Sequence, residues 1–196
     1  ILIRTKKLPL KNLIFVSLVI VAGCAGQQSA QGKGNGAMGM EGQVAVNDYP
    51  VYDISDQDKA NVLYMWEEEK LARDVYLELY DQWGHRVFGN ISSSEQRHMD
   101  GVYSLLAKYG VAVKVDPNQR GVYSLPEIQS LYQTLVSRGK ASLTSAFQVG
   151  KEIEELDIAD LKARMGTAQP DAKAVYTNLL NGSYRHLDAF NRQLGN

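Results

Sequence analysis

Apolar residues recur at intervals of three and four along most of the chain after position 55, which is the spacing of one face of an α-helix. Most of these stretches open at a Ser or a Pro and close at a glycine, as helices often do. The predicted helices cover 55–83, 90–109, 142–165 and 170–194. A short one runs from the capping-box pattern Ser124-Leu125-Pro126-Glu127 to Gly139. Only 111–115 alternates, which is too brief for a sheet, so the predicted class is all-α.

The lengths of these elements predict their arrangement. We expect two antiparallel hairpins, 55–83 with 90–109 and 142–165 with 170–194, joined by a crossover over 110–141 that carries the short extra helix. One long crossover between two hairpins is typical of ferritin-like four-helix bundles, whereas cytokine-type bundles need two.

The first fifth of the chain has the order of an export signal. Basic residues in 4–11 precede the apolar run 13–21, which is too short to span a bilayer, and Ala22-Gly23-Cys24 follows, similar to a bacterial lipobox. We therefore expect a lipoprotein signal peptide over 1–23, lipidation at Cys24 and an exported protein anchored in the cell envelope, on its periplasmic or extracytoplasmic face. The alternative is a free cysteine that happens to end an apolar run.

Composition divides the remainder of the chain. Residues 25–42 are rich in Gly, Gln, Ser and Ala, which predicts a flexible tether over 24–54 before a folded bundle over 55–196. The whole chain of 196 residues has 21 Lys and Arg against 22 Asp and Glu, without a basic cluster in the bundle, so we expect no nucleic-acid partner. A single cysteine excludes an internal disulfide framework and zinc sites built on paired thiolates.

Polar residues on the core-facing stripes carry the functional prediction, because a buried carboxylate or imidazole is costly unless it is paired or bound to a metal. On the second helix, Glu95 and His98 share the face of Ile91, Val102 and Leu105. This Glu-x-x-His spacing places two side chains one turn apart, where they can reach a common metal ion.

Each of the other long helices offers a similar residue. Glu69 lies on the apolar stripe of the first helix with Glu68 at its margin, Glu154 lies on the fourth with Asp157 adjacent, and His186 lies on the fifth. The predicted metal ligands are Glu69, Glu95, His98, Glu154 and His186, with Glu68 and Asp157 as second choices. Carboxylates and imidazoles without thiolates suit iron or manganese. There are alternatives to these ligand roles. Residues 67–69 could be a solvated run of charges, His186 a histidine satisfied within the core, and Glu154 a surface residue.

The depths of these residues predict the first connection. Glu69 lies about 14 residues before the end of its helix and Glu95 about 5 after the start of the next, so a tight turn would leave them at different levels. We therefore expect an extended descending connection over 84–90 rather than a compact turn.

Four ordered blocks resemble one known family, the ferritin-like domain of unknown function 2202. The blocks are Glu67-Glu68-Glu69-Lys70-Leu71-Ala72-Arg73-Asp74-Val75-Tyr76, Ser94-Glu95-Gln96-Arg97-His98-Met99, Ile153-Glu154-Glu155-Leu156-Asp157-Ile158-Ala159-Asp160-Leu161 and Ser183-Tyr184-Arg185-His186-Leu187. The resemblance implies a ferritin-like bundle and a metal centre, without an assigned activity.

The chain is also similar to the wider group of di-iron carboxylate proteins, with one departure. Ser183 stands where a second Glu-x-x-His motif would have its Glu, which leaves His186 alone on the last helix. Asp157, one turn after Glu154, is the candidate for the missing oxygen ligand; otherwise the site is asymmetric, mononuclear or weak.

A di-iron or di-manganese centre favours an oxidase or ferroxidase, with Tyr76, Tyr103 and Tyr184 as residues that could lie near the metals. One cysteine cannot form a rubredoxin-like module, so a peroxidase would need a separate electron donor. The alternatives are a non-catalytic lipoprotein module that sequesters metal or docks a partner, and a degenerate bundle in which Glu95, His98 and His186 form a buried hydrogen-bonded cluster. The sequence does not decide whether the protein forms a homodimer.

Overall fold

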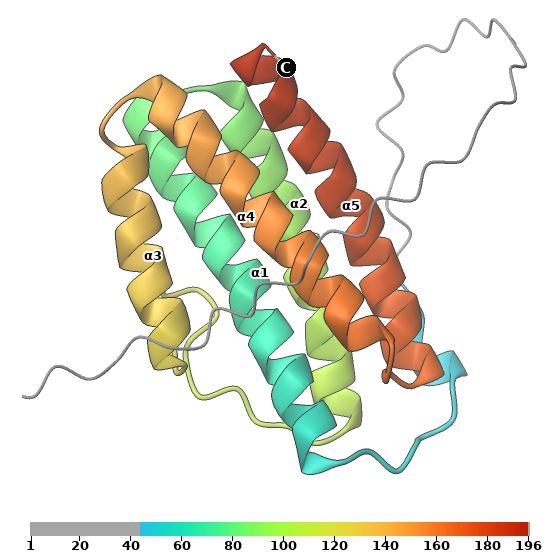
Figure 1. Ribbon diagram of the computed structural model, residues 1–196. Coiled ribbons are helices and arrows are strands. Elements are labelled where there is room, and N and C mark those ends of the chain that lie inside the picture. The colour runs from blue at the N-terminus through green and yellow to red at the C-terminus, as the bar shows by residue number, and fades with distance from the viewer. Residues whose placement is uncertain (1–43, 196) are drawn as a thin grey trace, which may run out of the picture. The chain divides into compact units, whose positions relative to one another are not determined.

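The structure is a computed structural model that describes residues 44–195 (Figure 1). The described residues form helices and no strand, which confirms the predicted all-α class. The elements are the 3-10 helix η1 (Val46–Asp48) and the helices α1 (Asp56–Trp83), α2 (Arg86–Lys108), α3 (Pro126–Gly139), α4 (Leu143–Met165) and α5 (Pro170–Leu194).

The long helices form a bundle of two antiparallel hairpins, α1 with α2 and α4 with α5. Between the hairpins, α2 packs on α5 and α1 packs on α4, while α3 lies outside against α1 and α4. Because α3 carries the chain back along the length of the bundle, α2 and α4 run in the same direction (Figure 1). The expected hairpins and the crossover with its short helix are therefore present.

Most helix ends follow the capping chemistry expected from the sequence. Ser55 and Asp58 form a reciprocal capping box at the start of α1, and the Ser142 hydroxyl accepts from the Ser145 amide at the start of α4. The expected capping role of Ser124 is wrong, because Leu125 is the capping position of α3 and makes no side-chain hydrogen bond there. The Ser124 hydroxyl instead donates to the buried carboxylate of Glu67.

The connection between α1 and α2 is a compact turn, so the expected extended descent over 84–90 is wrong. Only Gly84 and His85 lie between the two helices, and Gly84 takes the left-handed conformation at φ 62° that suits a residue without a Cβ. Since α2 begins at Arg86, Glu95 lies deeper along it than the sequence indicated. Glu69 meets α2 at the level of His98, which removes the mismatch in depth.

A layer of buried polar side chains divides the apolar core in two. One apolar cluster fills the end of the bundle near the α1–α2 turn and includes Leu79, Phe88 and Phe190. The other fills the opposite end and includes Trp66 and Leu105. The polar residues that lie between these clusters come from all four long helices and are Glu68, Glu69, Glu95, His98, Glu154, Asp157 and His186.

The described end of the expected tether is packed on the bundle. Val46 is buried, and the Lys108 ammonium donates to the carbonyl oxygens of Val46 at 3.0 Å and Tyr49 at 3.2 Å. The same ammonium lies 2.6 Å from the buried Asp171 carboxylate. A flexible tether over the whole of 24–54 is therefore wrong for residues 44–49, which were assigned to it on composition alone.

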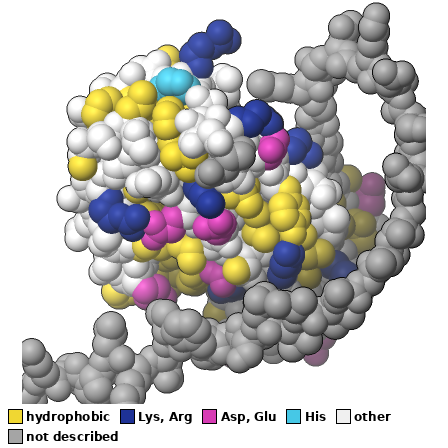
Figure 2. All heavy atoms as spheres, turned by 45° about the horizontal axis from the view of Figure 1, so that its top comes forward, with side chains coloured by type: hydrophobic (Ala, Val, Ile, Leu, Met, Phe, Trp, Pro, Cys, Tyr) yellow, Lys and Arg dark blue, Asp and Glu magenta, His cyan; other side chains and the backbone are white. Residues whose placement is uncertain are grey.

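The expected signal peptide (1–23), the lipidation site Cys24 and tether residues 24–43 lie outside the described residues. Among the described helices, none combines the length and apolar character needed to cross a membrane. On the face shown in Figure 2, Lys and Arg side chains are interspersed with Asp and Glu. Neither sign of charge dominates this face.

Gly150 of α4 tests the close packing beside the polar layer. A Cβ at this position would come within 2.4 Å of the Phe190 ring, which is fully buried and has no room to move. We expect Gly150→Ala to lower the free energy of unfolding by about 1–3 kcal/mol, as overpacking does. Chemical denaturation measures the change.

The control is Gly166→Ala at the end of the same helix, where the backbone is right-handed and no atom lies within 4 Å of the added Cβ. It should be neutral or slightly stabilising. Equal effects of the two substitutions would contradict the packing described for α4 and α5.

Candidate metal centre

The centre of the polar layer is built on α2. Glu95 and His98 lie one turn apart on its inner face and are 2% and 1% exposed. Ile91, Val102 and Leu105 are buried on the same face, so the burial that anchors the helix also fixes these two polar side chains in the interior.

The structure brings the five first-choice ligands together from the four long helices. They form two groups in which the possible ligand atoms all lie within 4.8 Å of one another. The first group is Glu69, Glu95 and His98; the second is Glu95, Glu154 and His186.

Glu95 belongs to both groups and uses a different oxygen in each. Its Oε2 lies 2.6 Å from Nδ1 of His98, and its Oε1 lies 2.8 Å from Nδ1 of His186. The outer carboxylates complete the arrangement, with Glu69 Oε2 3.3 Å from His98 Nδ1 and Glu154 Oε2 3.5 Å from His186 Nδ1. The site thus has two halves that share one carboxylate.

Several of these atoms are close to one another without hydrogen-bond geometry. In the part of the chain that the structure describes, Glu69 Oε1 is buried and makes no hydrogen bond, and the ion-paired Glu95 Oε1 and His186 Nδ1 lie 2.8 Å apart without hydrogen-bond geometry. A buried polar atom without a partner costs about 1–3 kcal/mol. Lone pairs that converge in this way fit a shared cation, so the donor set is suited to a metal ion.

In the metal-free cluster, electrostatic interactions shift the pKa values of the carboxyl groups in opposite directions. Burial acts to raise the pKa of Glu95, but the imidazoles of His186 and His98 outweigh it and lower that pKa well below its usual range. Burial raises the pKa of Glu69 and of Glu154 instead. Burial would lower the pKa of His186, yet the carboxylates of Glu95 and Glu154 raise it to about 10.

Two hydroxyl groups position the carboxylates of α4. The fully buried Tyr76 donates to Glu154 Oε1, while its ring packs against Phe88 and Phe190. Ser183, which stands where a Glu was expected on α5, donates to Asp157 Oδ2. The serine therefore orients a carboxylate of the facing helix in place of supplying its own.

The second-choice residues Glu68 and Asp157 are buried beside the two groups and belong to neither. Glu68 Oε2 and Asp157 Oδ1 make no hydrogen bond among the described residues. Burial raises the pKa of Asp157 against the Ser183 hydrogen bond that lowers it, and the nearby Glu154 and Glu95 carboxylates bring it to about 7.

Sequence reasoning missed a second buried charged cluster on α1. Asp74 accepts from Lys70 at 2.6 Å and from Arg73 at 2.7 Å, and both cations also donate to carbonyl oxygens of the crossover. On the same face, Glu67 accepts from the backbone amides of Ser124 and Leu125. The sequence feature that could have indicated this cluster is the charged run 67–74, because its charges fall on every face of the helix and some of them must therefore face other parts of the protein.

Two of the three tyrosines that could have been near the metals lie elsewhere. Tyr103 and Tyr184 are 53% and 43% exposed, because they occupy the outer faces of α2 and α5. His85, in the turn between α1 and α2, is half-buried and packs edge-on against Phe147 with ring centres 5.0 Å apart.

A family described as an uncharacterized protein domain, DUF2202, matches residues 58–196. The chain belongs to this family. The match covers α1 to α5 and confirms the family resemblance read from the sequence.

One relative of the DUF2202 chain described here is the uncharacterized protein MJ0754 of Methanocaldococcus jannaschii. It is 46% identical over 152 residues, which cover 77% of this chain and 82% of the relative. A crystal structure of the hypothetical protein MJ0754 from Methanococcus jannaschii is similar to this fold with a TM-score of 0.72 and 45% identity, covering 75% of this chain and 85% of that one. Neither name states an activity.

Asp157 makes the stability of the metal-free DUF2202 protein depend on pH. Its pKa is about 7 in the folded chain and 3.8 by the ordinary value, so the folded state holds a proton that the unfolded state releases. The free energy of unfolding should therefore fall between about pH 4 and pH 7, by up to about 1.4 kcal/mol per pH unit from this group. Denaturant titrations of chelator-treated protein across this range measure it.

Asp157→Asn removes the titration and keeps an acceptor for the Ser183 hydroxyl, so the slope should become smaller. Glu155→Gln, an exposed position on the same helix, should leave it unchanged. An Asp157→Asn protein with the wild-type slope would show that Asp157 is not the group responsible.

Proposed function

We propose that this protein is a ferritin-like metal-binding protein whose bundle holds two iron or manganese ions, and that it acts as an oxidase or ferroxidase. The two hairpins, the single long crossover and the parallel course of α2 and α4 support a ferritin-like topology. The family membership is compatible with this and adds no activity of its own.

The observation that carries the proposal is the position of Glu95. Its two oxygens face different imidazoles at 2.6 Å and 2.8 Å, which is the arrangement of a carboxylate that bridges two ions. Glu69 and His98 would complete the ligands of one ion, and Glu154 and His186 those of the other. Oxygen and imidazole donors suit iron and manganese, and a dinuclear site suits two adjacent ions.

Charge balance assigns a role to Asp157. Two divalent ions bring four positive charges, whereas Glu69, Glu95 and Glu154 bring three negative ones. Asp157, buried beside the site and oriented by Ser183, supplies the fourth. This compensates for the Glu that Ser183 replaces and argues for two ions over a mononuclear site.

Two iron ions bound here would supply electrons for the reduction of dioxygen or peroxide. The protein's own contribution is to exclude water with the apolar clusters on either side, and to hold Glu154 through the Tyr76 hydroxyl. A catalytic cycle needs an external reductant, either Fe(II) itself or a separate electron donor. The lipobox-like segment supports export and a lipid anchor for this activity.

Two other functions remain as outcomes of the test. Sequestration without catalysis uses the same ligands and differs only in turnover. A degenerate, metal-free cluster leaves Glu69 Oε1 buried without a hydrogen bond and the Glu95–His186 ion pair without hydrogen-bond geometry, which is the specific observation against it.

Elemental analysis and aerobic Fe(II) addition test the proposal on the full chain. We expect two ions of iron or manganese per chain after metal-supplemented preparation. Oxygen uptake should continue with repeated Fe(II) additions for an oxidase, stop at a stoichiometric amount for sequestration, and be absent for a metal-free bundle.

Glu95→Gln should lower the affinity for both ions together, by more than about 100-fold, the upper end of the loss caused by removing an outer-shell partner. Glu155→Gln on α4 is the matched control and should bind two ions as the wild type does. A Glu95→Gln protein that keeps one tight ion would contradict the bridging role, and wild-type protein without bound metal would remove the proposed function.

A further inference from the structure

A row of carboxylates on α4, called the file below, leads from the centre toward solvent. Glu154, Asp157 and Asp160 follow one another at intervals of three, which places them on one side of the helix. Glu154 and Asp157 are buried, whereas the Asp160 side chain is 32% exposed. The file therefore connects one half of the centre with the protein surface.

Glu68 lies across this file on α1. It is buried, its Oε2 makes no hydrogen bond among the described residues, and the same holds for Oδ1 of Asp157. Burial raises the pKa of Glu68, and the carboxylates of Asp157, Asp160 and Glu69 add to the effect. Four carboxylates already balance two divalent ions, so Glu68 is not needed for the charge of the centre and keeps an oxygen without a hydrogen bond.

Arg164 stands at the surface end of the file. Its Nη1 lies 2.9 Å from Asp160 Oδ1, and its guanidinium carbon lies 4.2 Å from the ring centre of Tyr64, whose hydroxyl donates to Asp160 Oδ2 at 3.1 Å. A positive group thus occupies the place where an incoming cation would first meet a carboxylate.

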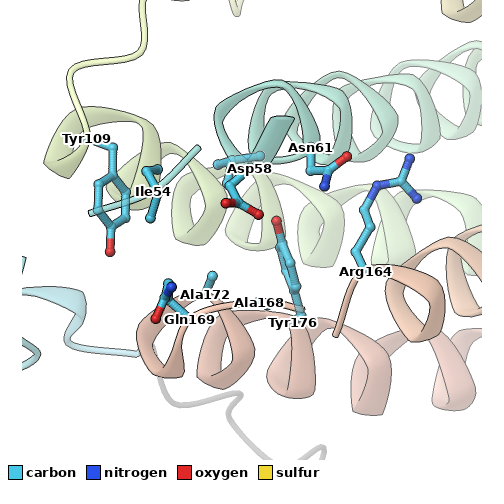
Figure 3. A pocket seen from close by; sticks show the side chains of 10 residues that line it. Ile54, Asp58, Asn61, Tyr109, Arg164, Ala168, Gln169, Ala172 and Tyr176 are labelled. Atoms are coloured by element: carbon cyan, nitrogen blue, oxygen red, sulfur yellow. The ribbon is translucent and has the colours of Figure 1, made fainter. Parts of the chain in front are cut away.

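A small pocket lies beside the surface end. Arg164 borders a pocket of about 20 Å³, room for one water molecule, at the end of the bundle. Figure 3 shows Asp58, Asn61 and Tyr176 around this pocket with Arg164 at its edge.

We propose that this file is the access route of divalent cations to the centre, with Glu68 and Asp157 forming a transfer site and Arg164 acting as the gate at Asp160. The inference rests on the proposed function. Hard divalent cations prefer oxygen ligands, and carboxylates at successive depths give an ion a new partner before it leaves the last one. The guanidinium excludes cations electrostatically until one displaces it from Asp160.

A second hollow is the competing route. It has a volume of about 290 Å³, lies between α2 and α5, and reaches His98 directly. Its charged lining is Arg97 and Asp100, so it presents one carboxylate beside one guanidinium and no succession of anionic ligands. The file along α4 is therefore the better path for a cation, although the hollow is larger.

Stopped-flow loading of the metal-free full chain with Co(II), followed by its visible absorption, tests the route. Glu68→Gln should slow loading about tenfold, because carboxylates that line a path raise association rates by factors of 10 to 1,000. Arg164→Gln should accelerate loading. Both variants should reach the same final number of bound ions as the wild type, which shows that they are folded and that the centre is intact.

Opposite effects from two neighbouring residues are not expected of a structural role. Glu155→Gln is the control for charge removal on α4, and Asp100→Asn tests the hollow beside His98. Wild-type loading rates in both Glu68→Gln and Arg164→Gln would overturn the inference, as would slowing in Asp100→Asn alone. A wild-type chain that binds no Co(II) would instead overturn the proposed function and this route with it.

Discussion

The structure depends on one constraint, which is that five carboxylates and two imidazoles are buried in one layer of the bundle. Carboxylates away from water need cations or hydrogen-bond donors, and the described residues supply few donors to them. Glu95 is the centre of the arrangement, because its two oxygens link α2 to itself through His98 and to α5 through His186. The apolar clusters above and below close the two ends of the bundle around this layer, so the same packing that stabilises the fold keeps water from reaching the site along the bundle axis.

The sequence predicted the helices well because their ends carry strong local signals. Ser55, Ser142, Gly84 and Gly195 each fix an end through a hydrogen bond or a left-handed backbone. It failed at the start of α2, where His85 is an unusual capping residue and where Gly89 lies inside the helix. It failed at Ser124 because a capping pattern in the chain does not show that a buried carboxylate from 57 residues away competes for the same hydroxyl.

The site was predictable where helix periodicity alone decides the face. Glu95 with His98 follows directly from spacing, and Glu69, Glu154 and His186 follow from their apolar neighbours. Periodicity could not show that the crossover covers a second face of α1, so Lys70, Arg73 and Asp74 looked solvent-exposed although they are buried. It also could not separate Tyr76 from Tyr103 and Tyr184, since exposure of an aromatic residue at the edge of a stripe depends on which helices are neighbours.

The hydrogen bonds that fasten residues 46–49 to Lys108 have a mechanical consequence. Lys108 at the end of α2 holds two carbonyl oxygens of this segment and the Asp171 carboxylate at the start of α5. A pulling force applied through the N-terminal side of the chain therefore acts first on this fastening, at one end of the bundle. The load passes into the ends of α2 and α5, and α1, with its ligand Glu69, is spared until the fastening ruptures.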